Sequence, residues 1–276
     1  LDFLKTSASP ERSFSYVAFS TDNYPDAQSL AWAKNNASLF IKYNLSAIVV
    51  DTEAVAKKVS QSIANNEITF EDAVTTYSNQ SGTDTTGKIT RSFAYEVQTL
   101  FSNKNDLESV TSLTAGQLSP IVKTTNSFAI VRCDGDAVQP NFDDETILSS
   151  IKSYMKTNEK GIIQDYFVSY AKDFTNKARA DGFAPAASAN KLDVKTTSAF
   201  CLNYGNNDIL TPVPIESNIE LSSVVNNENF FKVAFALKAN EVSEPIIADP
   251  YVLVLQLLEE KTADQQNLEM LPYLYS

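Results

Sequence analysis

LTAGQLSP at residues 113–120 has a counterpart in LKANEVSEP at residues 237–245. Each stretch runs on into an apolar run that suits a strand, at residues 128–131 and 251–255. Gly116 fits the C-terminal cap of a helix, because glycine reaches positive φ most easily. The repeat predicts one structural unit present twice, with Ser119 equivalent to Ser243 and one residue inserted before the second proline. We interpret it as a duplication whose second copy has lost its first helices.

The residues before the first stretch predict the rest of that unit. A β-rich run at 45–50 precedes helices at 54–65 and 70–77, and residues 78–86 are polar and turn-rich, as in a loop. A third helix is expected to end near Leu113, followed by strands at 119–123 and 127–133. The predicted order is therefore β-α-α-α-β-β.

Patterns outside this unit are simpler. Residues 12–19 alternate as a strand does, and apolar residues at helical spacing follow to about residue 43. A long amphipathic segment spans 143–178 with Gly161 midway, and residues 182–189 have the composition of a linker. The last third predicts a strand at 195–203, a helix at 228–237 and a strand pair at 246–259, broken near Asp249-Pro250.

These patterns predict an α+β fold in which two α/β units are joined by a long helical connector. We expect a strand-helix lead-in at 1–44, the first unit at 45–138, the connector at 139–190 and a shortened second unit at 191–276.

Composition excludes several classes of function. The net charge is −12 without a basic cluster, which argues against nucleic acid and against an anionic membrane surface. The 276 residues include no histidine and two cysteines, so a zinc site is not expected, and no cofactor motif occurs. Cys133 and Cys201 are either a disulfide or two buried thiols. No apolar run is long enough to span a bilayer.

The chain begins at Leu1 rather than Met, which suggests a piece of a longer protein. We expect the preceding part to hold a signal or an anchor, and any membrane contact to be made only through that part.

Several motifs together resemble the parvulin family of peptidyl-prolyl isomerases, and more narrowly the SurA/PpiD-type periplasmic folding factors. The resemblance covers about residues 45–135. It rests on AIVV at 47–50, alanines at 54 and 56, FEDAVTTYS at 70–78, GKI at 87–89, LTAGQLSP at 113–120 and SFAIV at 127–131.

The resemblance also shows what the chain lacks. The two family histidines fall on Ala47 and Ala129, and the family Cys or Asp falls on Gln80. In the second copy the later histidine falls on Val252. Two alanines and a glutamine cannot titrate near neutral pH. We therefore expect no catalytic residue, and isomerase activity that is absent or weak against an uncatalysed barrier of about 18–20 kcal/mol.

The resemblance implies a degenerate peptide-binding pocket, lined by Ala47, Gln80, Leu113, Phe128 and Ala129. We expect a non-catalytic chaperone of the periplasm or cell envelope that binds extended or unfolded polypeptide. A weak prolyl isomerase and a scaffold that docks an envelope partner are the alternatives. The client and the oligomeric state do not follow from the sequence.

Other groupings of polar residues favour ordinary structural roles. The acidic run at 143–145 suits a helix N-terminus, where negative charge is stabilised. Ser119 and Ser243 have no histidine or nearby lysine to act as a base, so neither is expected to be a nucleophile.

Overall fold

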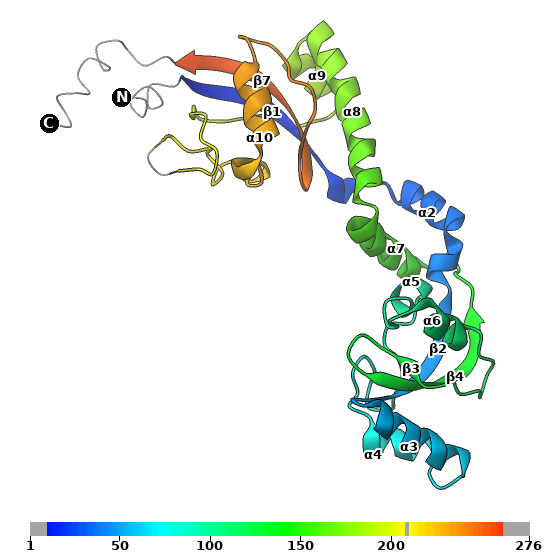
Figure 1. Ribbon diagram of the computed structural model, residues 1–276. Helices are drawn as coiled ribbons and strands as arrows, with labels where there is room; N and C mark the ends of the chain where they lie inside the picture. Colours follow the sequence, from blue (N-terminus) through cyan, green and yellow to red (C-terminus); the bar gives the residue numbers. More distant parts are fainter. Residues whose placement is uncertain (1–9, 208–209, 262–276) are drawn as a thin grey trace, which may run out of the picture. The chain divides into compact units, whose positions relative to one another are not determined.

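The computed structural model describes residues 10–207 and 210–261. They form two compact units (Figure 1). Unit 1 combines the residues up to Pro25 with those from Tyr154 onward, and unit 2 comprises Asp26–Ser153. The chain has the mixed α+β architecture that the sequence predicts, with one antiparallel sheet in each unit.

Unit 2 is built on a three-stranded sheet in the order β2-β4-β3, from Lys42–Val50, Phe128–Val138 and Val122–Lys123. Successive side chains of a strand point to opposite faces, so the sheet packs on both sides. Helices α3 (Glu53–Ala64) and α4 (Phe70–Tyr77) cover one face. Helices α5 (Ala94–Val97) and α6 (Lys104–Thr111) contribute to the core on the other face.

The N-terminal caps explain where two of these helices begin. The Thr52 hydroxyl accepts a hydrogen bond from the Val55 amide at 3.3 Å, and the Thr69 hydroxyl accepts one from the Asp72 amide at 3.1 Å. Unit 2 also contains α2 (Asp26–Asn35), a 3-10 turn η2 (Ala37–Phe40), and the greater part of α7 (Glu145–Asn158).

Unit 1 is built on a four-stranded sheet in the order β5-β1-β7-β6. Its strands are β5 (Lys195–Thr196), β1 (Glu11–Ser20), β7 (Tyr251–Lys261) and β6 (Ile246–Ala248). Helix α10 (Glu228–Ala236) packs its aromatic side chains on one face. Helix α8 (Lys160–Asp181) lies on the other face, where the Phe174 ring is 6.0 Å from that of Phe19, and α9 (Phe183–Ala189) packs against α8.

Three short 3-10 turns complete unit 1. They are η1 (Thr21–Asn23), η3 (Ile219–Leu221) and η4 (Val224–Asn226).

The sequence repeat corresponds to a repeated hydrogen-bond pattern. The Ser119 amide donates to the Val131 carbonyl at 2.7 Å, and the Ser119 hydroxyl accepts from the Val131 amide at 2.9 Å. Ser243 and Leu255 repeat both bonds, at 2.8 and 2.9 Å. Each serine lies 12 residues before its partner. The equivalence of the two serines is confirmed, and the expectation of an inserted residue is wrong.

The turn before each serine repeats as well. Gly116 and Asn240 both have positive φ, 84° and 61°. The side chain of the next residue caps the turn in both units. Gln117 accepts from the Thr114 amide at 2.9 Å, and Glu241 accepts from the Lys238 amide at 2.8 Å.

Strand β1 completes the second copy. In unit 2 the first strand, β2, pairs antiparallel with β4, so that Ala47 lies opposite Val131. In unit 1 the place of β2 is taken by β1, which pairs with β7 so that Tyr16 lies opposite Leu255. The first strand of the second copy is therefore the strand that the sequence suggested as a lead-in, and the first copy is inserted after it.

Several expected elements differ in the structure. Residues 182–189 form α9 rather than a linker, because Phe183, Ala186 and Ala187 are buried against α8 and a proline is tolerated in a first helical turn. The helix expected to reach residue 43 ends at Asn35, since β2 already begins at Lys42.

The remaining differences concern length. The amphipathic segment at 143–178 is interrupted at Glu159, between α7 and α8. Strands expected at 195–203 and 119–123 shorten to the two-residue strands β5 and β3. The strand pair broken near Asp249-Pro250 is confirmed as β6 and β7. Cys133 and Cys201 are buried free thiols in different units.

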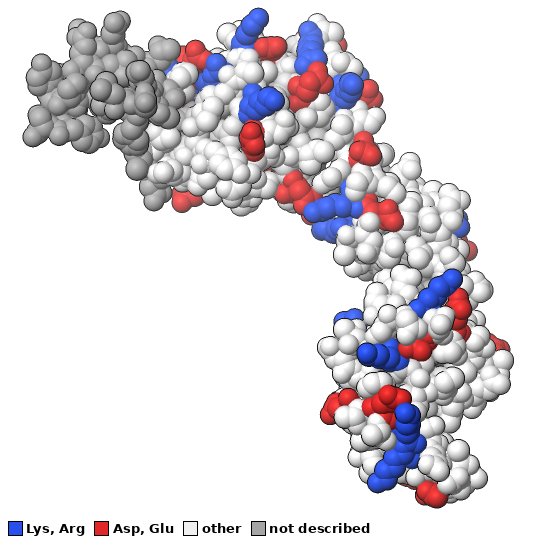
Figure 2. All heavy atoms as spheres, viewed as in Figure 1, with Lys and Arg blue, Asp and Glu red and all other residues white. Residues whose placement is uncertain are grey.

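Charged side chains of both signs are interspersed on the face of each unit that Figure 2 shows. Within the described residues, none of the helices is both long and apolar enough for a membrane span.

Candidate functional site

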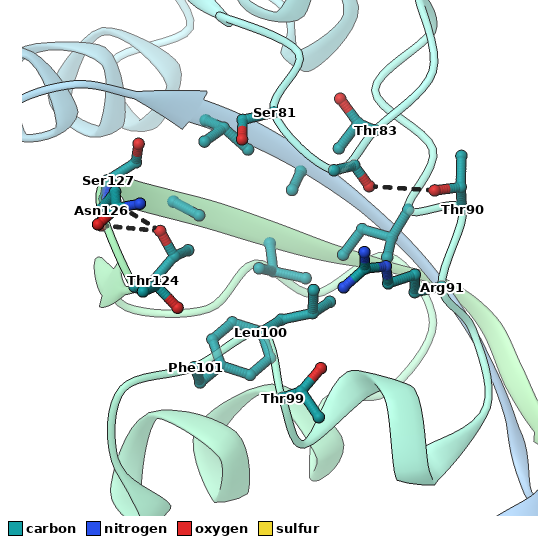
Figure 3. A pocket seen from close by; sticks show the side chains of 17 residues that line it. Ser81, Thr83, Thr90, Arg91, Thr99, Leu100, Phe101, Thr124, Asn126 and Ser127 are labelled. Atoms are coloured by element: carbon teal, nitrogen blue, oxygen red, sulfur yellow. Dashed lines mark hydrogen bonds between the residues drawn. The ribbon is translucent and has the colours of Figure 1, made fainter. Parts of the chain in front are cut away.

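Unit 2 contains a cavity of about 360 Å³ on the β2–β4 face that also holds α5 and α6 (Figure 3). Its floor is apolar and comes from two cross-strand pairs, Ala47 with Val131 and Val49 with Ala129. Leu100 and Phe101 add apolar side chains to the wall. The remaining lining is mostly polar: Ser81, Gly82, Thr83, Ile89, Thr90, Arg91, Thr99, Thr124, Thr125, Asn126 and Ser127.

The loop after α4 forms one wall because it is hydrogen-bonded along β2. The Ala47 amide donates to the Gly87 carbonyl at 2.7 Å, and the Val49 amide donates to the Ser78 hydroxyl at 3.1 Å. Gly87 has φ +83°, and an added Cβ would lie 2.8 Å from a Val74 methyl group. The loop can therefore approach the strand this closely only with glycine at position 87.

The Asp84 side chain stabilises the conformation of the same loop. Its carboxylate accepts hydrogen bonds from the Thr86 hydroxyl at 2.7 Å and from the Lys88 amide at 3.0 Å. The Thr86 bond, followed by the Lys88 bond, lowers the pKa of Asp84. A carboxylate that closes a turn in this way has a structural role, and Asp84 does not line the cavity.

The opposite wall is the turn between β3 and β4. The Thr124 hydroxyl donates to the Ser127 carbonyl and accepts from the Ser127 amide, both at 3.0 Å. Phe101 bridges to Thr124, and the Ser102 amide donates to the Lys123 carbonyl at 3.0 Å. These contacts hold the segment with Phe101 against the turn between β3 and β4.

Two of the five predicted pocket residues line this cavity. Ala47 and Ala129, which the sequence resemblance aligns with the two parvulin histidines, lie in its floor and are each 2% exposed. Gln80 is exposed, has φ 57° and directly precedes the lining residue Ser81. Leu113 packs against the core beside the floor. Phe128 points to the opposite face, toward α3 and α4, because it neighbours Ala129 on the same strand.

Most of the wall could not be predicted from sequence patterns. Arg91, Leu100 and Phe101 lie in loops without a motif, and only the packing of these loops on the sheet brings them to the floor. Arg91 is the one charged side chain among the lining residues. The side chains of the floor carry no group that can donate, accept or titrate, so the floor can contact an apolar side chain.

The equivalent position in unit 1 is filled instead of open. Tyr16 occupies the place of Ala47 and is fully buried. Ile246 pairs with Leu253 as Val122 pairs with Ala129, so Leu253 takes the place of the later histidine. The expectation that Val252 does so is wrong by one residue.

Tyr16 belongs to a buried polar network. Its hydroxyl donates to the Glu220 carboxylate at 3.1 Å and accepts from the Asn218 amide group at 3.0 Å. Burial, together with the nearby carboxylate, raises the pKa of Tyr16 to about 12. Burial is the largest influence on Glu220 and would raise its pKa, but the hydrogen bonds from Lys195, the backbone and Tyr16, together with the charge of Lys195, outweigh it, and the pKa is lowered.

Comparison with known proteins agrees with this architecture. The family model of the PPIC-type PPIase domain, also called rotamase, matches residues 43–135. A second model, described as a third domain, matches residues 196–262. Fold and match together define a protein with a parvulin domain of the PPIC type.

Two relatives extend the comparison. An uncharacterized protein of Treponema pallidum (strain Nichols) is 40% identical over 201 residues, which cover 73% of this chain and 78% of that protein. An uncharacterized protein of Borreliella burgdorferi is 23% identical over 267 residues, which cover 96% of this chain and 52% of that protein. The chain belongs to the family of the Treponema pallidum protein. It spans about half the length of the Borreliella relative.

Solved structures provide distant neighbours. The peptidylprolyl isomerase PrsA of Bacillus cereus is 17% identical, with a TM-score of 0.36, over 59% of this chain and 63% of that one. A structure described with the SurA-like chaperones of Campylobacter jejuni is 16% identical, with a TM-score of 0.29, over 57% and 64%. These scores are too low to support an argument about function.

Proposed function

We propose that this chain is a folding factor of the cell envelope that holds extended or unfolded polypeptide without catalysing prolyl isomerisation. The observation that carries the proposal is the cavity in the PPIC-type domain, whose floor has Ala47 and Ala129, the residues that the sequence resemblance aligns with the two family histidines. In this proposal the cavity would bind a peptide, and the alanine methyl groups would provide no side chain that acts on it.

The size and surface of the cavity suit a short apolar piece of a client. Small-molecule sites typically enclose about 300–1,000 Å³ and combine an apolar lining with a few polar groups. Here the floor would take a small side chain or a prolyl ring, and the hydroxyl-bearing wall would face the peptide backbone. We assign client binding to residues 45–138, with Ala47 and Ala129 at the centre of the site.

The names of the neighbours support the location. The Bacillus cereus neighbour, PrsA, is a peptidylprolyl isomerase, and the Campylobacter jejuni neighbour is described with a periplasmic protein and SurA-like chaperones. By analogy we place this chain in the periplasm or cell envelope, with unfolded polypeptide as its partner. Any membrane attachment would lie outside this chain.

A test of client holding uses the whole chain. An unfolded client is diluted into buffer with an equimolar amount of the protein, and light scattering records aggregation. Ala129→Trp should fill the cavity and abolish protection. Ala137→Trp places the same side chain at an exposed position of the same strand and should leave protection intact. Circular dichroism establishes that both variants are folded. Absence of protection by the parent chain would refute the proposal.

A weak prolyl isomerase is the second candidate, and the apolar floor of the cavity favours it. Removing an amide from water can lower the barrier to rotation without an acid or a base. A proline-peptide turnover assay on the same two variants separates the candidates. Turnover that Ala129→Trp abolishes and Ala137→Trp retains would establish catalysis.

A further inference from the structure

Arg91 differs from the other arginines of the chain. The sequence has four arginines, and three of them donate to carboxylates. Arg12 pairs with Glu260, Arg132 with Glu71 and Arg179 with Glu244. In the part of the chain that the structure describes, the Arg91 guanidinium has neither an ion-pair partner nor a hydrogen-bond acceptor.

Arg91 is also one of the residues that line the cavity. Its guanidinium is directed into the cavity, on the side of Leu100 and Phe101 (Figure 3). The lining contains no Asp or Glu, although the whole chain carries 34 acidic residues against 22 basic ones. Arg91 is exposed to solvent, so a planar group with several N–H donors lies at the mouth of an apolar floor, and no Asp or Glu of the lining neutralises it.

A second polar group of the lining also lacks a partner. The Thr83 hydroxyl oxygen is buried and has no hydrogen-bond partner among the described residues. Buried polar atoms are nearly always paired in folded proteins, so this hydroxyl is an exception, and its oxygen is enclosed by protein atoms rather than exposed to the cavity. Thr83, Thr90 and Arg91 all line the cavity.

We propose that the cavity selects peptide segments that carry a carboxylate next to a small apolar residue or proline, with Arg91 binding the carboxylate. This inference rests on the proposed client binding and specifies its substrate class. The carboxylate has two sources in a polypeptide, an Asp or Glu side chain and the free end of the chain. Both are planar anions that accept two parallel bonds from a guanidinium.

Labelled hexapeptides test the proposal by fluorescence anisotropy on the whole chain at fixed salt. One series has Glu, Gln or Lys before a central proline with an amidated end, and a further peptide has Gln with a free terminal carboxylate. We expect the Glu peptide to bind roughly fivefold more tightly than the Gln peptide, the upper range for a partly exposed ion pair. The Lys peptide should bind more weakly than both.

Variants identify the residue responsible. Arg91→Gln should equalise the Glu and Gln peptides, and Arg91→Glu should reverse the order in favour of Lys. Lys88→Gln makes the same change of net charge nearby, outside the lining, and should preserve the preference. If the free-end peptide alone shows an Arg91-dependent advantage, the chain terminus is the source of the carboxylate.

The outcomes separate this proposal from the proposed function. Equal binding of the Glu, Gln and free-end peptides to the parent chain, or a carboxylate preference that survives Arg91→Gln, would overturn the carboxylate selection and leave client binding standing. Failure of every peptide to bind, whatever its charge, would contradict client binding itself.

Discussion

Removal of the buried hydroxyl at Ser119 should destabilise unit 2 measurably. The Ser119 oxygen is the acceptor for the amide of Val131, a residue with no exposed surface, at 2.9 Å. In Ser119→Ala that amide stays buried without a partner. An unsatisfied buried donor costs about 1–3 kcal/mol of the free energy of unfolding. With a urea m-value of about 2 kcal/mol/M, a loss of about 2 kcal/mol lowers the unfolding midpoint by about 1 M.

The chain supplies a selective probe for this experiment. Trp32 is the single tryptophan, and it lies in α2 of unit 2 with its ring 6.3 Å from that of Phe40. Urea unfolding followed by tryptophan fluorescence therefore reports on unit 2, while far-UV circular dichroism reports on both units. Ser243→Ala removes the equivalent bond in unit 1 and should lower the midpoint of the dichroism signal by a similar amount.

Ser112→Ala serves as the matched control. Ser112 is exposed, and its hydroxyl makes no hydrogen bond among the described residues. The urea unfolding midpoint of Ser112→Ala should therefore stay within about 0.2 M of the parent, as for an ordinary surface substitution. If Ser119→Ala behaves like Ser112→Ala, the hydroxyl does not serve as the acceptor for the strand, and the structural basis of the repeat is refuted.

Three further predictions follow from other parts of the chain. The pKa of Tyr16 is about 12 in the folded chain, against 10 for the ordinary group. The contribution of its protonated hydroxyl to the free energy of unfolding is therefore complete below pH 10 and is lost as the pH rises to 12. Between pH 10 and pH 12 the free energy of unfolding of the parent should therefore fall by roughly 2 kcal/mol more than that of Tyr16→Phe, as measured by urea titrations. Tyr170→Phe, which changes an exposed ring, should show the same pH dependence as the parent. Gly87→Ala should lower the free energy of unfolding by about 2–4 kcal/mol, because the positive φ and the close contact with a Val74 methyl group both oppose an added Cβ. Gly116→Ala also has positive φ but open space around the added Cβ, so it should lower the free energy of unfolding by only about 1 kcal/mol. Equal losses would contradict the contact at Gly87. Client holding should not change between pH 5.5 and 8, since the chain has no imidazole to titrate; a transition near pH 6.5 in the light-scattering assay would contradict this.

Local features of the fold were predictable because their signals lie close together in the chain. The repeat around Ser119 and Ser243 depends on a turn and a strand only 12 residues apart, and its residue types specify the turn directly. The helix caps at Thr52 and Thr69 follow the same logic. Distant pairings carry no such signal. The partnership of β1 with β7 could not be inferred from alternation alone, which is equally compatible with any antiparallel neighbour.

The candidate site was predictable in its floor and not in its walls. Ala47 and Ala129 follow from alignment with a family motif on regular strands, where side-chain direction alternates. Phe128 was assigned to the pocket although it neighbours Ala129, and this alternation sends its side chain to the other face. Arg91 and Phe101 reach the cavity through loop packing, which propensity does not specify.

The split of unit 1 along the chain has a kinetic consequence. Pairing β1 with β7 closes a loop of about 230 residues between Ser20 and Tyr251, an entropic cost that grows with the logarithm of loop length. Unit 2 lies entirely within this loop, and once folded it holds Lys152 and Asp26, near its two ends, 2.7 Å apart. The loop left to close is then about 100 residues, which lowers the cost by about 0.7 kcal/mol. Early folding of the inserted unit thus speeds completion of the unit that surrounds it, by roughly threefold.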